Sequence, residues 1–176
     1  MVNGLNIRLR ALEPKDIDIL YQWENDQKLW SFGCTTAPFS RHVLDQYIEN
    51  SHHDIYTTGQ LRFMIDTINA HPQTIGMVDL YAFEPFHMRS GVGIMINEDF
   101  RNKGYGSEAI DLIIEYAFKF MNFKQLFCEI TIDNPSSLIL FKNKGFQQTG
   151  TRIEWVRRGN KFIDTHFLQL INTNHI

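Results

Sequence analysis

Apolar and polar residues alternate along much of the chain in the pattern of β-strands that are buried on one face. Residues 5–11 (LNIRLRA) alternate in this way, and several later runs are almost entirely apolar, as strands inside a sheet often are. Turn-forming segments such as NAHPQ separate these runs and indicate hairpins. The pattern predicts seven strands, at residues 5–11, 61–66, 74–83, 91–96 and 126–132 and in two runs that flank Gly159 and Asn160.

Residues at helical spacing predict four helices between these strands. Pro14 suits the first turn of one helix, and Ser40 suits the N-cap of a second helix that extends to about Ile48. The helix that follows residue 104 is the clearest, because its apolar residues lie on one face and its charged residues on the other. A fourth, short helix is predicted to open at Asn134.

The order of these elements defines the fold class. A strand, two helices, three strands, a helix, a strand, a helix and two strands predict an α/β fold with a mixed, mostly antiparallel sheet. One parallel crossover is expected around the long helix. The 176 residues are 43% hydrophobic and contain no repeat or linker segment, so we expect one domain over residues 1–176.

Charge and composition narrow the function classes. A net charge of -3 argues against nucleic-acid binding, which normally needs a basic excess. The two cysteines, Cys34 and Cys128, are far apart and suggest neither a disulfide nor a zinc site, and the segment His52–Asp54 is interpreted as a polar loop, so no metal is expected. The chain shows no apolar signal core and no membrane-spanning run, which predicts a soluble, cytoplasmic protein.

The stretch RNKGYG, residues 101–106, places two glycines and two cations between an apolar strand and the clearest helix. Glycine lets the backbone turn sharply or approach a ligand, and a helix N-terminus presents unpaired N–H groups and partial positive charge. These features favour a phosphate site, although a tight turn with glycines selected for packing gives the same pattern. The dinucleotide-binding GxGxxG motif is not matched, because Ala109 stands at its third glycine.

Two spaced motifs resemble those of the GNAT superfamily of acyl-CoA-dependent N-acyltransferases. The Arg-x-x-Gly-x-Gly pattern of residues 101–106 is similar to the pyrophosphate loop of that family, and residues 132–146 (IDNPSSLILFKNKGF) resemble its later strand-to-helix block. The opening IRLRALEPKDIDILYQWEND and the closing EWVRRGNKFIDTHFLQLI look like the branch of ribosomal-protein N-terminal acetyltransferases and spermidine N-acetyltransferases. The resemblance implies the single-domain GNAT fold, whose seven-stranded sheet splays apart between strands four and five and is flanked by about four helices.

The resemblance also implies how acetyl-CoA, the co-substrate, is held. The backbone of residues 95–97 would pair with the pantetheine arm in the splay, and backbone amides of the glycine turn would bind the pyrophosphate. Asn134 would reach the pantetheine, with a plain helix cap as the alternative, and Lys142 or Lys144 would approach the adenine end, with a solvated surface as the alternative. The positions implied to bind the cofactor are Met95, Ile96, Asn97, Arg101, Asn102, Lys103, Gly104, Tyr105, Gly106, Ser107, Asn134, Phe141 and Lys142.

Two positions depart from the family pattern. Typical members carry a Tyr that protonates the leaving thiolate, and Phe141 stands at that position. Gly91 or Val92 stands where spermidine-type relatives tend to carry a Glu. The usual acid and a direct base are therefore both missing, and Tyr81 or Tyr105 are the tyrosines that could replace the acid.

Four acidic residues remain as candidate proton acceptors. Asp79 and Glu84 are the first choices, and Glu24 and Glu129 are the weaker ones. Asp79 lies in the apolar stretch MVDLY, where partial burial would help a carboxyl group to accept a proton, unless it faces outward on a half-exposed strand. Glu84 lies at the end of the same strand. We expect either residue to act through ordered water.

These inferences together predict an enzyme that transfers an acetyl group from acetyl-CoA to a primary amine by direct attack in a ternary complex. The negative charge balance favours a polyamine such as spermidine, because acidic side chains attract a cation. The N-terminal α-amine of a protein is the alternative acceptor, and a coenzyme-A-binding sensor without turnover is the alternative class. No nucleic-acid or membrane partner is expected, and a homo-oligomer is possible.

Overall fold

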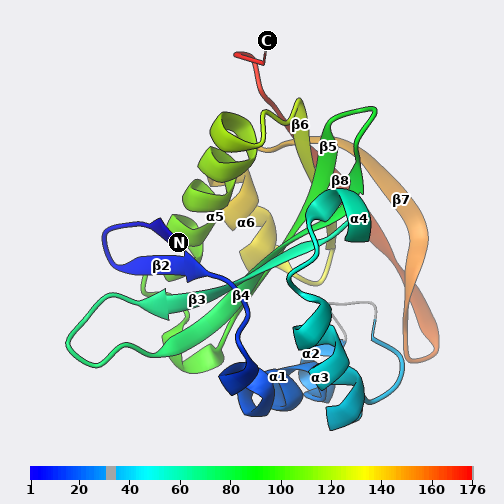
Figure 1. The fold of residues 1–176 in the computed structure, drawn as a ribbon. Coiled ribbons are helices and arrows are strands. Elements are labelled where there is room, and N and C mark those ends of the chain that lie inside the picture. Colours follow the sequence, from blue (N-terminus) through cyan, green and yellow to red (C-terminus); the bar gives the residue numbers. More distant parts are fainter. Residues whose placement is uncertain (31–34, 176) are drawn as a thin grey trace.

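A mixed eight-stranded sheet forms the centre of the computed structural model, which describes residues 1–30 and 35–175 (Figure 1). The strands lie side by side in the order β1-β2-β3-β4-β5-β6-β8-β7. Every neighbouring pair is antiparallel except β5 and β6. The strands are β1 (Val2–Asn3), β2 (Ile7–Arg10), β3 (Leu61–Thr67), β4 (Thr74–Glu84), β5 (Arg89–Ile96), β6 (Gln125–Thr131), β7 (Gln147–Arg158) and β8 (Lys161–Ile171).

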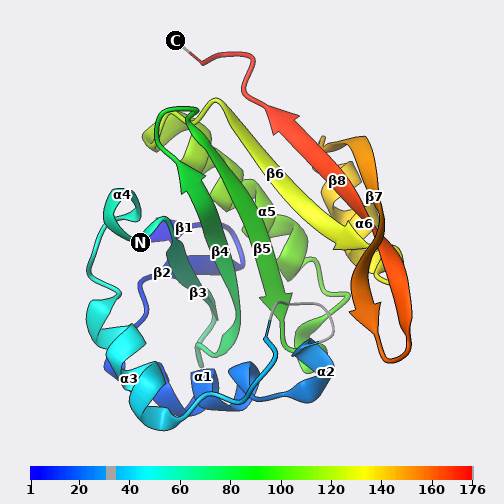
Figure 2. The same cartoon turned by 90° about the vertical axis from the view of Figure 1, so that its right-hand side faces the viewer.

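Six α-helices surround the sheet in the part of the chain that the structure describes. In Figure 2, α5 and α6 lie behind the sheet, and α1, α2 and α3 lie around its lower end. The helices are α1 (Ile17–Glu24), α2 (Gln27–Trp30), α3 (Arg41–Asn50), α4 (Ile55–Thr58), α5 (Tyr105–Glu115) and α6 (Pro135–Asn143). The chain continues from α5 as a π-helix over residues 116–120. Among the described residues, no helix is long and apolar enough to cross a bilayer.

Two apolar clusters, one on each face of the sheet, hold the layers together. The larger cluster contains Ile110 and Ile113 of α5 and Ala117 of the π-helix that follows, all fully buried against the sheet. The smaller cluster joins α1 and α3 to the opposite face through residues that include Met64. On the outer side of this helical segment, Lys119 forms an ion pair with Glu115 one turn earlier, at 2.9 Å.

The sheet opens between its two parallel strands, and this opening positions the site. β5 and β6 pair only at their first residues, from Arg89 with Gln125 to Gly91 with Phe127. Beyond these residues the strands diverge, as Figure 2 shows for β5 in green and β6 in yellow. The diverging parts, residues 92–96 of β5 and 128–131 of β6, leave backbone groups without a neighbouring strand on that side.

The structure confirms the α/β class, the parallel crossover around α5 and the splay, and it corrects the number of elements. The sheet has eight strands, not seven, because the two residues of β1 are too few to show a period of two. Six α-helices replace the expected four, because α2 and α4 are single turns of four residues without a recognisable apolar stripe. Ser40 caps α3, as expected, by accepting a hydrogen bond from the backbone N–H of Val43. Cys34 lies outside the described residues.

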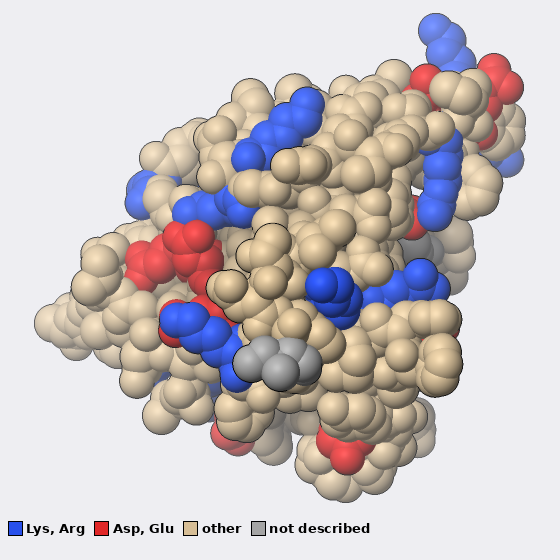
Figure 3. Space-filling model, turned by 90° about the horizontal axis from the view of Figure 1, so that it is seen from above, with Lys and Arg blue, Asp and Glu red and all other residues tan. Residues whose placement is uncertain are grey.

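Charged side chains of both signs occur on the surface. In Figure 3, Lys and Arg side chains and Asp and Glu side chains are interspersed on the same face of the molecule. Among the described residues, no group of three or more His, Cys, Asp or Glu side chains lies close enough to hold a metal ion. The segment His52–Asp54 instead leads into α4, where the Asp54 carboxylate accepts the Thr57 N–H at 2.8 Å.

Candidate active site

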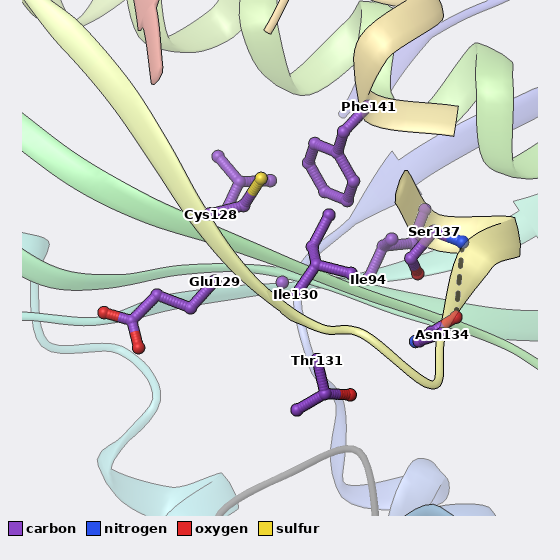
Figure 4. Close-up of a pocket in the computed structure, with 10 residues that line it drawn as sticks. Ile94, Cys128, Glu129, Ile130, Thr131, Asn134, Ser137 and Phe141 are labelled. Carbon is purple, nitrogen blue, oxygen red and sulfur yellow. Dashed lines mark hydrogen bonds between the residues drawn. The ribbon is translucent and has the colours of Figure 1, made fainter. Parts of the chain in front are cut away.

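A cavity of about 130 Å³ occupies the splay between β5 and β6 (Figure 4). Its walls are the diverging edges of the two strands and the first turns of α6. The lining residues are Val92, Gly93, Ile94, Cys128, Glu129, Ile130, Thr131, Asn134, Ser137 and Phe141. The cavity therefore combines apolar side chains with backbone edges that lack a strand partner.

Only every second residue of β5 turns its backbone N–H and C=O groups toward the free edge of the strand. The Asn97 N–H donates to Ile75 O at 2.8 Å, and the Asn97 C=O accepts the Phe100 N–H at 2.9 Å. The backbone groups of Met95, two residues earlier, therefore face β4. The backbone groups of Ile94 and Ile96 consequently face the splay. Of the three residues expected to pair with a pantetheine arm, only Ile96 is oriented for that role, and Ile94 has the same orientation. The role of Met95 and Asn97 stays a prediction, and this alternation favours Ile94 and Ile96 over them.

The glycine turn caps α5 with its backbone alone. Gly104 adopts φ +85°, a left-handed conformation that favours glycine, and it is the N-cap of α5. Among the described residues, no side chain caps this helix end, and the first N–H bonded to the turn is that of Glu108, which donates to Gly104 O at 3.0 Å. The N–H groups of residues 105–107 thus point out of the helix at the positive end of its dipole. This arrangement suits an anion such as a pyrophosphate.

The cations of the turn are directed to backbone carbonyl groups. Arg101 Nε donates to Ile96 O at 2.9 Å, which ties the turn to the end of β5. Lys103 Nζ donates to Asp99 O at 2.8 Å and lies 5.1 Å from the centroid of the Phe100 ring. Both side chains therefore stabilise the turn in this structure.

The two lysines near the end of α6 differ in their surroundings. Lys144 Nζ lies 2.5 Å from Asp111 Oδ2, an ion pair that joins α6 to α5. Lys142 is exposed. Of these two lysines, Lys142 is the one that lies on the surface without a recorded ion pair among the described residues. It stays a prediction for the adenine end of the cofactor.

Asn134 is both a helix cap and a part of the cavity wall. Its Oδ1 accepts the Ser137 N–H at 3.2 Å and the Ser136 hydroxyl at 3.1 Å, which confirms the capping role. Because capping uses the oxygen, the Nδ2 amide is the group of this side chain that remains to donate a hydrogen bond to a ligand. Figure 4 shows Asn134 beside Ile94 and Thr131 at one end of the cavity.

Phe141 projects from α6 into the cavity, close to Cys128 (Figure 4). Its ring is only 2% exposed and packs edge-on against Phe146, with the centroids 5.0 Å apart. The position at which the family usually carries a Tyr is thus inside the splay. Burial, with a smaller contribution from the nearby Glu129 charge, raises the pKa of the Cys128 thiol to about 12.

The first-choice proton acceptors lie in different places. Asp79 is held by Arg62, whose Nε and Nη2 donate to its two oxygens at 2.7 Å each, while Arg62 Nη1 donates to Glu24 at 2.5 Å. Glu84 lies opposite Arg89 in the register of β4 and β5, at the closed end of the splay, and is exposed. Neither Asp79 nor Glu84 lines the cavity, because strand register carries each carboxylate away from it.

The ring of Tyr81 explains why Gly91, near the start of β5, has no room for a side chain. A Cβ at Gly91 would lie 2.4 Å from Cζ of Tyr81, so the ring of Tyr81 fills the space that a side chain at this position would occupy. The same ring contacts Phe127 of β6 edge-on, at a centroid distance of 5.9 Å. Tyr105, in contrast, begins α5 and packs against the larger apolar cluster.

Glu129 is the carboxylate that the structure brings to the cavity. It is the only charged residue of β6 (QLFCEIT), and a lone charge in an otherwise apolar strand is the sequence signal that could have ranked it first. Its Oε1 accepts a hydrogen bond from Arg152 Nη1 of β7 at 2.6 Å. Ile94, Thr131 and Ser137 also line the cavity and were not anticipated.

The sheet opens between two parallel strands, and a glycine turn caps the N-terminus of the adjacent helix. This arrangement defines the class of GNAT-type acyltransferases. A family model described as an acetyltransferase (GNAT) domain matches residues 6–147. The chain belongs to this family and is a GNAT acetyltransferase, as the two sequence motifs indicated.

Similar proteins cover nearly the whole chain at low identity. A spermidine N(1)-acetyltransferase of Vibrio cholerae is 22% identical over 170 residues, which are 97% of this chain and 95% of the relative. An Escherichia coli spermidine N(1)-acetyltransferase is 22% identical over 150 residues, which are 85% of this chain and 77% of the relative. The crystal structure of the Vibrio cholerae spermidine N-acetyltransferase with CoA and spermine has a TM-score of 0.86 at 20% identity. The match covers 97% of this chain and 98% of the chain in that structure. At such identity, the structural likeness establishes the fold.

Proposed function

We propose that this protein transfers the acetyl group of acetyl-CoA to a primary amine of a polyamine such as spermidine. The observation that carries the proposal is the cavity in the splay, which lies between the free edge of β5 and the start of α6. The names of the similar proteins and the net charge of -3 support a polycationic acceptor. A dodecameric structure of the Vibrio cholerae relative supports a homo-oligomer.

The residues present fit acetyl-CoA along its length. The amides of the pantetheine arm would pair with the backbone of Ile94 and Ile96 and with Nδ2 of Asn134. The pyrophosphate would accept hydrogen bonds from the N–H groups at the start of α5, residues 105–107, where the helix dipole adds partial positive charge. The thioester would then lie in the cavity near Phe141 and Cys128.

Direct attack by the amine agrees better with this cavity than a covalent intermediate does. Cys128 is the nucleophilic side chain nearest to the proposed thioester, but burial raises the pKa of its thiol to about 12, so hardly any thiolate exists at neutral pH. The amine therefore has to reach the thioester itself. The departing thiolate carries developing negative charge, which the N-terminus of α6 at Asn134 would stabilise.

The proposal is tested by the release of free thiol from acetyl-CoA in the presence of single amines. We expect turnover with spermidine, and we expect its apparent affinity to fall steeply with added salt, because charges are screened beyond about 8 Å at physiological ionic strength. The matched comparison is a neutral peptide with a free N-terminus. Turnover of the peptide alone would identify an N-terminal acetyltransferase, and binding of acetyl-CoA without turnover of any amine would identify a coenzyme A sensor.

The variant Phe141→Tyr tests whether the cavity lacks a general acid. The added hydroxyl would extend into the cavity, and we expect a gain of a fewfold in kcat with a new alkaline limb near pH ~10, the ordinary pKa of a phenol. Phe120→Tyr is the control, because Phe120 is exposed on the π-helix and should not change the rate. If the Phe141 variant binds acetyl-CoA normally and shows neither effect, the thioester does not lie beside this ring.

A further inference from the structure

The acceptor amine has to approach the splay from the face of the sheet opposite to α5 and α6. Those two helices lie behind the sheet in Figure 2, and the proposed phosphate site at the start of α5 lies with them. The donor would therefore occupy the helix-covered side of β5 and β6. A second substrate that attacks the thioester between the strands must come from the other side, which is turned to the viewer in Figure 2.

The side chain of Glu129 points toward this open face. Cys128 and Ile130, its neighbours on β6, are buried in the cluster that contains Phe141, so strand alternation directs Glu129 to the opposite face. Figure 4 shows its carboxylate turned away from Phe141. The side chain is 30% exposed, so the carboxylate is accessible from solvent on this face, and the residue belongs to the cavity lining.

Arg152 holds the Glu129 carboxylate by one oxygen. The hydrogen bond from Arg152 Nη1 at 2.6 Å goes to Oε1, and Oε2 has no hydrogen-bond partner among the residues that the structure describes. Arg152 is itself oriented by aromatic rings, with its guanidinium carbon 4.8 Å from the centroid of Trp155 and 5.6 Å from that of Phe167. This ion pair leaves one carboxylate oxygen for an ammonium group.

Aromatic rings border the same position. Phe127 of β6 stacks on Phe167 of β8 at a centroid distance of 5.5 Å, and Tyr81 meets Phe127 edge-on. A carboxylate beside aromatic rings is the chemistry that binds an alkylammonium ion, because the ring faces carry partial negative charge. Asp79 cannot compete for this role, since Arg62 occupies both of its oxygens.

We propose that Glu129 binds the ammonium group of the acceptor and takes its proton before attack. This inference rests on the proposed function and names the residue that receives the acceptor. One proton moves from the ammonium nitrogen to Oε2 of Glu129, and the freed lone pair forms the C–N bond with the thioester carbonyl carbon. The C–S bond breaks, and its electron pair leaves with the thiolate, which takes up the second proton lost by the nitrogen.

The charged and titratable groups recorded near Glu129 are few. Among the described residues they include the Arg152 guanidinium on β7, the buried Cys128 thiol on the same strand and the Tyr81 phenol on β4, whose ring contacts Phe127. The facing part of β5 contributes Val92, Gly93 and Ile94, which do not titrate, and β8 contributes Phe167.

The variant Glu129→Gln tests this assignment, since it keeps the shape and a hydrogen bond to Arg152 but cannot take a proton. With spermidine we expect kcat/KM to fall at least 10²-fold, while calorimetric affinity for CoA stays unchanged. The wild-type protein should show a plateau of kcat/KM above the acidic range. In the variant only the neutral amine reacts, so log kcat/KM should rise with unit slope toward the amine pKa near ~10.

The control is Asp18→Asn, which also removes a carboxylate paired with an arginine, here Arg41 at 2.7 Å, on the surface of α1. It should retain the wild-type rate and profile. A Glu129→Gln protein that binds CoA and keeps the wild-type kcat/KM and plateau would overturn the role of Glu129 and leave the proposed function intact. A wild-type protein that acetylates no amine would overturn both.

Discussion

A valine in place of Gly106 is expected to weaken the binding of CoA at least tenfold, which corresponds to about 1.4 kcal/mol, without unfolding the protein. A Cβ at this position would lie 3.6 Å from Cγ1 of Ile96 and 3.7 Å from Cδ2 of Leu140, so the free protein has room for it. The added side chain would, however, fill the gap between the start of α5, the end of β5 and α6. A ligand that reaches from the phosphate-binding turn into the splay has to pass this gap. Isothermal calorimetry measures the loss directly.

Two left-handed glycines provide a matched control for the turn itself. Gly104 (φ +85°) and Gly59 (φ +69°) both have no atom within 4 Å of an added Cβ, so Gly104→Ala and Gly59→Ala introduce the same kind of backbone strain. Each substitution should lower the free energy of unfolding by about 1–2 kcal/mol. Only Gly104→Ala should also lose affinity for CoA. If the folded Gly104→Ala and Gly106→Val proteins bind CoA with wild-type affinity, the turn is not part of the cofactor site.

Replacing Arg10 with methionine is expected to lower the free energy of unfolding by about 3–5 kcal/mol at pH 7. Arg10 is buried and donates to Asp16 Oδ2 at 2.6 Å and to Asp66 Oδ2 at 2.8 Å, with a further hydrogen bond to Thr74 at 3.0 Å. Its removal would leave the buried Asp16 without its cation and would leave Asp66 only the longer contact to Arg8, at 3.4 Å. Urea denaturation measures the loss, and Arg41→Met, which breaks the exposed pair with Asp18, should change it by less than about 1 kcal/mol.

The effect of Arg10→Met should shrink as the pH falls. Burial alone would raise the pKa of Asp66, but the hydrogen bonds from Arg10 and Thr74 outweigh it and lower the pKa in the folded wild-type protein. The wild-type carboxylate therefore contributes stability above its unfolded pKa of about 3.9 and loses it as the pH falls through the folded value. Without Arg10, only Thr74 and Arg8 still oppose the effect of burial on Asp66, so protonation at low pH should cost the variant less stability than it costs the wild-type protein. A constant difference between the two proteins from pH 7 to pH 4.5 would contradict this account.

The sequence by itself determined the features that depend on neighbours along the chain. The glycine turn before α5 and the Asn134 cap of α6 were readable because each is formed by residues a few positions apart. The order of strands and helices, and with it the family, followed from apolar periods and two short motifs. These local patterns were sufficient for the fold class and for locating the turn at the start of α5 that we propose as the phosphate site.

The tertiary structure decided which polar groups are available, because pairing partners come from distant parts of the chain. Asp79 was a reasonable base in its apolar strand, but the hairpin of β3 and β4 places it opposite Arg62, which engages both of its oxygens. Glu129 lies 23 positions from Arg152, and only the arrangement of β6, β8 and β7 brings them together on the open face. Strand register also turned the backbone of Ile96, but not that of Met95, toward the splay. Whether a carboxylate or an amide can act on a ligand depends on this pairing in space, which no local period of the sequence encodes.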